Sequence, residues 1–120
     1  MATNVYRQYL MDEDSYVFYA RPKFIKIPFN KILYFSSDKR KIRLYCTDGT
    51  YEFYKKLDMV EEEISSRTKQ FVRLHKSYLI NLDYIKTYSK QEIKMKNGEI
   101  LGVSKKHKEY ARQVLQKLEV

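Results

Sequence analysis

The chain contains few of the residues that define several other classes of protein. Its 120 residues include one cysteine, three glycines, two prolines and no tryptophan. The single cysteine, Cys46, cannot form an internal disulfide, and no Cys/His cluster predicts a zinc site. So little glycine and proline argues against low-complexity disorder, and this length fits one domain with a modest core.

Long apolar runs and catalytic motifs are also missing. No segment approaches the roughly 18 apolar residues of a membrane span, and the N-terminal segment has no apolar centre suited to a signal peptide. We therefore expect a cytoplasmic protein with no membrane partner. There is no Gly-rich phosphate loop, and neither His75 nor His107 has a nucleophile at a telling spacing. The sequence predicts no enzyme, no catalytic residue, no metal and no cofactor.

Tyrosine and positive charge are abundant. Twelve Tyr and six Phe favour half-buried β structure. The 24 Lys+Arg residues outnumber the 15 Asp+Glu residues and give a net charge of +9. Such a domain attracts polyanions, whether DNA, RNA or an anionic membrane surface. Charge alone does not choose among them, and a soluble basic protein without a polyanion partner stays open.

The pattern along the chain predicts short antiparallel strands and small helices. Asp48-Gly49 and Asn97-Gly98 each separate two β-rich runs, which is a strong hairpin signal. The polar stretch 36–41 is predicted to be a loop. One helix is predicted over about 56–67 and a C-terminal helix over about 106–118, from apolar residues at helical spacing.

The segment 71–85 combines core residues with polar ones. If Val72 and Leu74 point inward in a strand, Arg73 and His75 share the outer face. Ser77 is predicted to cap a short turn over 78–82, where free backbone N–H groups could meet a phosphate. His75 alone could equally be a structural histidine.

Two further basic segments lie between predicted elements. Lys39, Arg40 and Lys41 fall in the predicted loop, where the other interpretation is a solvated hairpin. The segment 103–108 lies where a strand leads into the predicted C-terminal helix, and cations at a helix N-terminus oppose the helix dipole. An anionic ligand there would remove that penalty. Residues 1–15 are interpreted as an N-terminal segment or linker and 16–120 as one domain.

Two motifs resemble those of the LytTR DNA-binding domain. The run FVRLHKSYLIN at 71–81 resembles the family's Phe-x-Arg-x-His-(Arg/Lys/Asn)-Ser run, which ends in Asn. The step Val103-Ser104-Lys105-Lys106 resembles the family's Val-Ser-(Arg/Lys)-(Arg/Lys) entry into a helix. With the upstream strand and hairpin order, the resemblance covers about 17–118. Such domains typically close bacterial response regulators of two-component systems.

The resemblance implies a mostly β, elongated fold of short antiparallel sheets. It also implies a sequence-specific transcription regulator that inserts basic loops into successive major grooves of repeated sites on double-stranded DNA. Two protomers are expected on tandem or repeated half-sites. The base-reading candidates are Lys39, Arg40, Lys41, Lys76 and Lys105. The candidates for phosphate or supporting contacts are Arg73, His75, Ser77, Lys106 and Lys108.

Two alternatives stay open. A basic, tyrosine-rich β domain could bind RNA by stacking unpaired bases. The chain could also be a protein-interaction domain derived from a DNA-binding fold. No acidic phosphoacceptor cluster precedes residue 16, so we expect any receiver domain to be absent from this chain.

Overall fold

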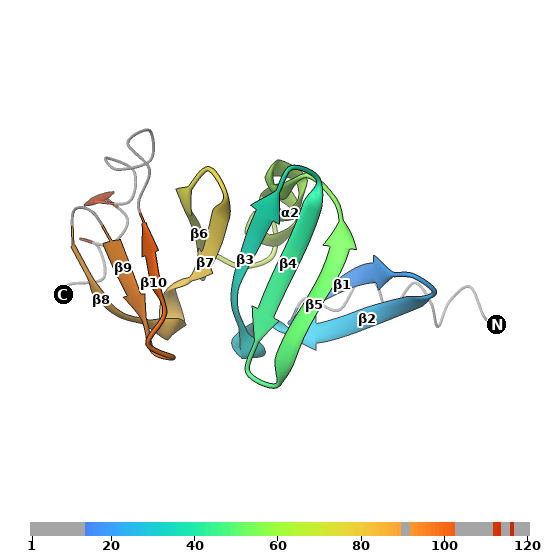
Figure 1. The fold of residues 1–120 in the computed structure, drawn as a ribbon, viewed down its shortest axis with the longest axis horizontal. Helices are drawn as coiled ribbons and strands as arrows, with labels where there is room; N and C mark the ends of the chain where they lie inside the picture. Colours follow the sequence, from blue (N-terminus) through green and yellow to red (C-terminus); the bar gives the residue numbers. More distant parts are fainter. Residues whose placement is uncertain (1–13, 90–91, 103–111, 114–115, 117–120) are drawn as a thin grey trace.

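The computed structural model describes residues 14–89, 92–102, 112–113 and 116. Within these residues the chain forms ten strands in three antiparallel sheets, one bounded α-helix and two short 3-10 helices. The body is elongated, with extents of 51 × 31 × 25 Å, and the sheets follow one another along its length (Figure 1). The predicted class, mostly β with short antiparallel sheets and small helices, is confirmed.

The first sheet is a hairpin that projects from one end of the body (Figure 1). Its strands β1 (Ser15–Ala20) and β2 (Lys23–Pro28) pair antiparallel. Pro28 ends β2, where its missing N–H removes no central ladder bond. The 3-10 helix η1 (Phe29–Lys31) then leads into the second sheet.

The second sheet forms the centre of the molecule and has the strand order β5-β4-β3-β7-β6. The third sheet has the order β10-β9-β8 and follows the 3-10 helix η2 (Leu82–Tyr84). The strands of the central sheet are β3 (Ile32–Asp38), β4 (Lys41–Cys46), β5 (Gly49–Tyr54), β6 (Phe71–His75) and β7 (Tyr78–Asn81). The strands of the third sheet are β8 (Ile85–Tyr88), β9 (Glu92–Met95) and β10 (Ile100–Gly102).

One face of the central sheet is covered by the helix α2 (Leu57–Ser65) together with β1. The helix buries Leu57, Val60 and Ile64, which recur at the helical spacing that places them on one face. They pack in one cluster with Phe35 and other side chains of the sheet. The helix predicted over about 56–67 is therefore confirmed.

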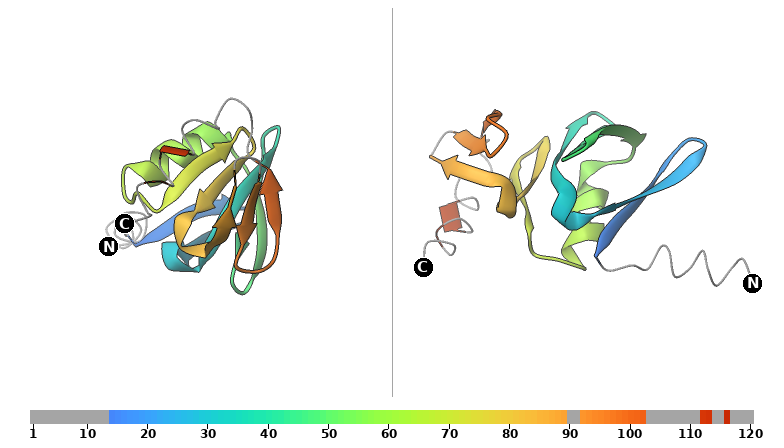
Figure 2. Two further views of the ribbon diagram at one scale, coloured as in Figure 1. Left: turned by 90° about the vertical axis from the view of Figure 1, so that its left-hand side faces the viewer. Right: turned by 90° about the horizontal axis from the view of Figure 1, so that it is seen from below.

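The third sheet covers part of the opposite face of the central sheet (Figure 2). Because side chains alternate along each strand, a second set of apolar residues points to that face. Ile93, Met95 and Leu101 of the third sheet pack against them. The members from the central sheet include Leu33, Tyr34, Val72, Leu74 and Ile80. Burial on both faces makes the central sheet the rigid base from which the turns project.

Both predicted hairpins are present. Strands β4 and β5 pair down to Cys46↔Gly49, so the turn itself is Thr47 and Asp48. At the second hairpin, Gly98 has φ 91°, in the left-handed region that favours glycine, and its N–H donates to the Met95 carbonyl at 2.9 Å. The turn chemistry read from the sequence thus located both chain reversals.

Two local predictions were wrong. The stretch 36–41 is not a loop, because β3 continues to Asp38 and β4 begins at Lys41. The segment 78–82 is not a capped turn, because Tyr78–Asn81 is the strand β7, paired with β3 and β6. In both places the ladder hydrogen bonds of the sheet outweigh the local turn preference of serine.

The predicted C-terminal helix lies almost wholly outside the described residues. Of the segment 106–118, the structure describes Arg112, Gln113 and Gln116 alone. The helix that it describes with bounds is α2, in the middle of the chain.

Tyr16 provides a test of the first core cluster at alkaline pH. Its side chain is 2% exposed, and its hydroxyl donates to Glu63 Oε1 at 2.9 Å. Burial, and then the Glu63 carboxylate, raise the pKa of Tyr16 well above its ordinary value of 10.0. The unfolded chain releases this proton near pH 10 while the folded chain keeps it. The free energy of unfolding should therefore fall as the pH rises above about 10.

Urea denaturation between about pH 8 and pH 11 measures this fall. Tyr16→Phe should make it shallower, because the variant has no hydroxyl to titrate. Tyr19→Phe is the matched control, since Tyr19 is 49% exposed on the same strand. An equally steep fall in Tyr16→Phe and the parent would show that Tyr16 does not stay protonated in the folded chain.

Candidate nucleic-acid interface

The first basic segment forms a tight turn between β3 and β4. Asp38 pairs with Lys41 across the ladder, so Lys39 and Arg40 make up the turn. Lys39 has φ 60°, the left-handed conformation that such turns need, and both side chains are exposed. Lys39 and Arg40 therefore stand at the tip of a rigid hairpin.

Lys41 differs from these two residues, because it belongs to β4. Its Nζ lies 2.8 Å from Glu52 Oε2, and Arg43 on the same strand lies 3.0 Å from Glu52 Oε1. These three side chains lie on the face of the central sheet that carries the third sheet, in the part that the third sheet does not cover, and each is between 42% and 48% exposed. Lys41 thus has a carboxylate partner already, unlike the expectation of three equivalent loop cations.

The second basic segment is the turn between β6 and β7, formed by Lys76 and Ser77. Lys76 is exposed. The Ser37 N–H donates to the Ser77 carbonyl at 2.9 Å, which joins this turn to the end of β3. The structure thus brings two of the three predicted basic segments together at the same end of the strands of the central sheet. This end of the strands is called the edge of the sheet below.

The third basic segment, with Lys105, Lys106 and Lys108, lies outside the described residues. The strand before it, β10, ends at Gly102. In Figure 1, β10 runs toward the same side of the molecule as the β3–β4 and β6–β7 turns. The chain therefore leaves the third sheet on the side where the two basic turns lie.

Arg73 is directed toward α2 and not toward solvent. Its side chain is 11% exposed, and NH1 lies 2.8 Å from Asp58 Oδ1 and 2.9 Å from Glu61 Oε1. Its other nitrogens donate to the carbonyls of His75 and Lys76. Arg73 therefore connects the β6–β7 turn to the helix, and the expectation that it shares an outer face with His75 is wrong.

His75 and Ser77 shape the same turn. The Ser77 N–H donates to His75 Nδ1 at 3.0 Å, and the His75 ring lies 5.0 Å from the Tyr78 ring. In the neutral ring the proton is then on Nε2. The Ser77 N–H already has an acceptor, so it does not match the free backbone donor that the sequence suggested for phosphate binding.

Two further lysines belong to this edge and were missed by sequence reasoning. The Lys55 N–H donates to the Arg40 carbonyl at 2.8 Å, which places the start of α2 beside the first basic turn. Lys55 Nζ is paired with Glu63 at 2.9 Å, whereas Lys56 is exposed. No sequence motif marks Lys56, because its position depends on the contact between β5 and the β3–β4 turn.

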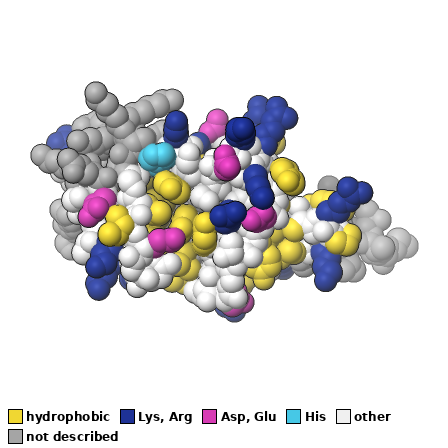
Figure 3. Space-filling view, viewed as in Figure 1, with side chains coloured by type: hydrophobic (Ala, Val, Ile, Leu, Met, Phe, Trp, Pro, Cys, Tyr) yellow, Lys and Arg dark blue, Asp and Glu magenta, His cyan; other side chains and the backbone are white. Residues whose placement is uncertain are grey.

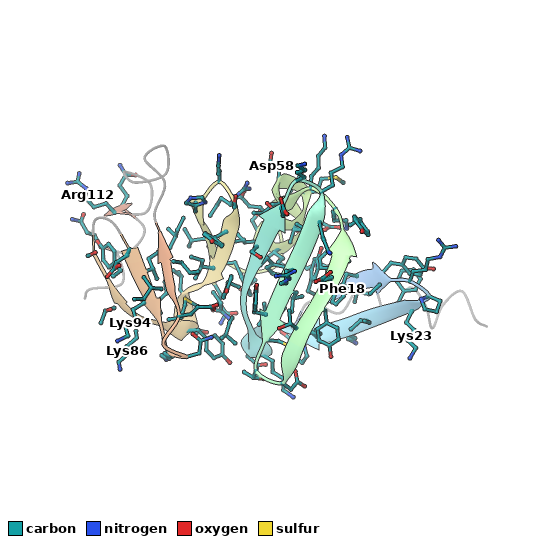
Figure 4. The ribbon with its side chains drawn as sticks, in the orientation of Figure 1. Phe18, Lys23, Asp58, Lys86, Lys94 and Arg112 are labelled. Atoms are coloured by element: carbon teal, nitrogen blue, oxygen red, sulfur yellow. The ribbon has the colours of Figure 1, made fainter. Side chains whose placement is uncertain are left out.

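The surface views agree with this arrangement. Figure 3 shows Lys and Arg side chains along the upper edge of the molecule, with Asp and Glu among them. In Figure 4, Asp58 marks the start of α2 at that edge, whereas Lys86 and Lys94 lie at the opposite, lower side. A cavity of about 530 Å³ lies below the edge, between the central sheet and the β9–β10 hairpin, with Tyr34, His75 and Glu99 in its wall.

The described residues show no sign of a metal or membrane site. Residues 14–89 and 92–102, with the few described beyond them, include no group of His, Cys, Asp or Glu that could hold a metal ion. None of the described helices has the length and apolar character that crossing a membrane requires.

Comparison with known proteins identifies the family. The model of the LytTr DNA-binding domain matches residues 22–116. Among solved structures, the LytTr DNA-binding domain of a methyl-accepting/DNA response regulator from Bacillus cereus is similar, with a TM-score of 0.71 and 23% identity. That match covers 85% of this chain and 96% of the other and supports the fold. No curated protein matches the chain.

The family match spans most of the 120 residues, so the chain belongs to the LytTR family of DNA-binding domains. The family is one of DNA-binding domains. The fold class and the family expected from the two motifs are both confirmed.

Proposed function

We propose that this chain is a sequence-specific transcription regulator, without enzymatic activity, that acts in the bacterial cytoplasm on double-stranded DNA. The observation that carries the proposal is the Ser37–Ser77 hydrogen bond, which holds two basic turns at one edge of the central sheet. Exposed cations on a rigid edge can enter a groove without first breaking packing contacts. On a repeated site, the basic loops of the bound protomers then contact successive major grooves.

The described cations divide into two groups by their partners. Lys39, Arg40 and Lys76 stand exposed on the turns and are the first candidates for reading base edges, together with Lys105 beyond β10. Lys41 contributes to base reading only after leaving Glu52. Lys106 and Lys108 contact phosphates, while Arg73, His75 and Ser77 support the β6–β7 turn through the contacts described above.

Two protomers occupy tandem or repeated half-sites on the duplex in this proposal. Phosphate contacts supply most of the affinity, so binding weakens steeply as salt rises. Base contacts by a few side chains set the preferred sequence.

Selection of bound duplexes from a random library tests the proposal. We expect enrichment of one repeated motif, with half-sites at a fixed spacing. Competition with single-stranded RNA is the second arm of the test. An unenriched library would contradict sequence-specific DNA binding, and RNA competing better than duplex would favour an RNA-binding module.

Lys76→Ala should weaken binding to the selected duplex by about 5- to 150-fold, because a lost base contact costs about 1–3 kcal/mol. Lys105→Ala should have an effect of similar size. Lys94→Ala is the matched control, since it removes one exposed lysine on the side away from the turns. Fluorescence anisotropy at two salt concentrations measures all three variants. Equal losses in Lys76→Ala and Lys94→Ala would show that only net charge matters.

A further inference from the structure

We propose that Tyr34 and Glu99 form a positioning pair that fixes where the third sheet stands relative to the two basic turns. The pair would thereby set the spacing on DNA between the segment read by the central sheet and the segment read beyond β10. This inference rests on the proposed function, because spacing has meaning only if both parts contact one duplex.

The pair joins two sheets through one short hydrogen bond. The Tyr34 hydroxyl, from β3, donates to Glu99 Oε2 at 2.6 Å, and the two residues are 65 positions apart. Tyr34 is 2% exposed, so its ring is fixed in the second core cluster. Glu99 directly precedes β10, the strand that leads toward Lys105. The bond therefore connects β3, which leads into the β3–β4 turn, to the start of β10, which leads toward Lys105.

Both partners are held in place before the bond forms. The Tyr34 ring stacks on Tyr45, with centroids 4.4 Å apart and planes at 18°, and meets Tyr78 edge-on at 6.0 Å. The Glu99 N–H donates to Asn97 Oδ1 at 3.0 Å, and its carbonyl accepts from Met95 at 2.8 Å. The Tyr34 ring and the Glu99 backbone are thus fixed without the bond, and the bond orders only the Glu99 side chain.

Apolar packing between the sheets does not fix their position equally well. Ile93, Met95 and Leu101 pack against the central sheet, and such contacts depend on buried area more than on direction. A hydrogen bond depends steeply on distance and angle. Because successive base pairs are about 3.4 Å apart, a shift of the hairpin by that distance moves its contact by one base pair.

The protonation of Tyr34 favours a lasting bond. Burial, and then the hydrogen bond to Glu99, raise the pKa of Tyr34 above its ordinary value, so the hydroxyl remains a donor at any pH that cells reach. The pair lies in the wall of the cavity between the sheets, which Asp38 of β3 and Lys41 and Arg43 of β4 also line.

The decisive measurement is discrimination between spacings. Duplexes selected with the parent chain are altered by inserting or deleting one base pair at each position of the selected motif. We expect the parent to bind the best altered duplex about tenfold more weakly than the original. Tyr34→Phe, which removes one oxygen atom, should bind the original duplex within about threefold of the parent and lose most of that tenfold preference.

Matched variants separate positioning from general damage. Glu99→Gln keeps an oxygen acceptor for the Tyr34 hydroxyl and should retain the preference for spacing, whereas Glu99→Ala should lose it. Tyr51→Phe is the control, because Tyr51 packs against the first core cluster on the other face of the sheet. Thermal melts should show all four variants folded.

The outcomes distinguish the two proposals. A parent that enriches no duplex overturns the proposed function and the spacing role with it. If the parent, Tyr34→Phe and Glu99→Ala all discriminate spacing equally well, the proposed function stands and the positioning role of Tyr34 and Glu99 is overturned. Loss of discrimination in Tyr34→Phe and Glu99→Ala, with retention in Glu99→Gln and Tyr51→Phe, supports it.

Discussion

Replacing Asn81 with leucine is expected to lower the free energy of unfolding by about 3–5 kcal/mol. The Asn81 side chain is fully buried, and its amide donates to the Phe29 carbonyl at 3.2 Å and to the Ile32 carbonyl at 2.8 Å. Its Oδ1 accepts the Asp83 N–H at 3.0 Å. Leucine has a similar volume but makes none of these bonds, and each unpaired backbone group near the core costs about 1–3 kcal/mol.

Urea denaturation followed by circular dichroism measures this loss. Asn97→Ala is the control, since Asn97 also accepts a backbone N–H two residues on, but at an exposed turn. We expect it to cost less than about 1 kcal/mol. A loss in Asn81→Leu no larger than the loss in Asn97→Ala would show that the three bonds contribute little.

The contacts of Asn81 also explain one position of the motif at 71–81. Asn81 lies at the end of the run FVRLHKSYLIN, which suggested a DNA contact for its neighbours. The structure places Asn81 in the interior, where it ties the end of β7 to η1, to the first residue of β3 and to η2. A buried asparagine that bonds backbone groups of three elements cannot be recognised from its immediate neighbours in sequence.

The features that the sequence predicted correctly depend on local chemistry. The spacing of Leu57, Val60 and Ile64 located α2, and the Asp-Gly and Asn-Gly pairs located two hairpins. These signals are independent of what the rest of the chain does. The family motifs then provided the architecture that periodicity alone could not.

The errors arose where distant contacts decide the structure. Ser36 and Ser37 are polar and suggested a loop, yet they pair with Arg43 and Ile42 of β4. Pairing with a strand on each side stabilises polar residues in an extended conformation that their own propensity does not favour. The same reason explains Lys41, whose partner Glu52 lies across the next ladder and could not be assigned from the basic run itself.

Arg73→Met is expected to lower the free energy of unfolding by about 2–3 kcal/mol and to weaken DNA binding by about tenfold. Methionine keeps the apolar stem but loses the contacts to Asp58, Glu61 and the two turn carbonyls. We place the loss below that of a fully buried pair because Asp58 is 85% exposed and Glu61 37% exposed. DNA binding weakens because the turn that presents Lys76 is no longer held against α2.

Arg43→Met is the matched control for this variant. Arg43 also pairs with a carboxylate, Glu52, but its side chain is 48% exposed and it bonds no turn carbonyl in the described structure. Its replacement should cost less than about 1 kcal/mol, as exposed ion pairs do. Lys76→Ala should weaken DNA binding without changing stability, whereas Arg73→Met should change both. An Arg73→Met variant that binds DNA weakly but unfolds like the parent would make Arg73 a direct DNA contact instead of a support for the turn.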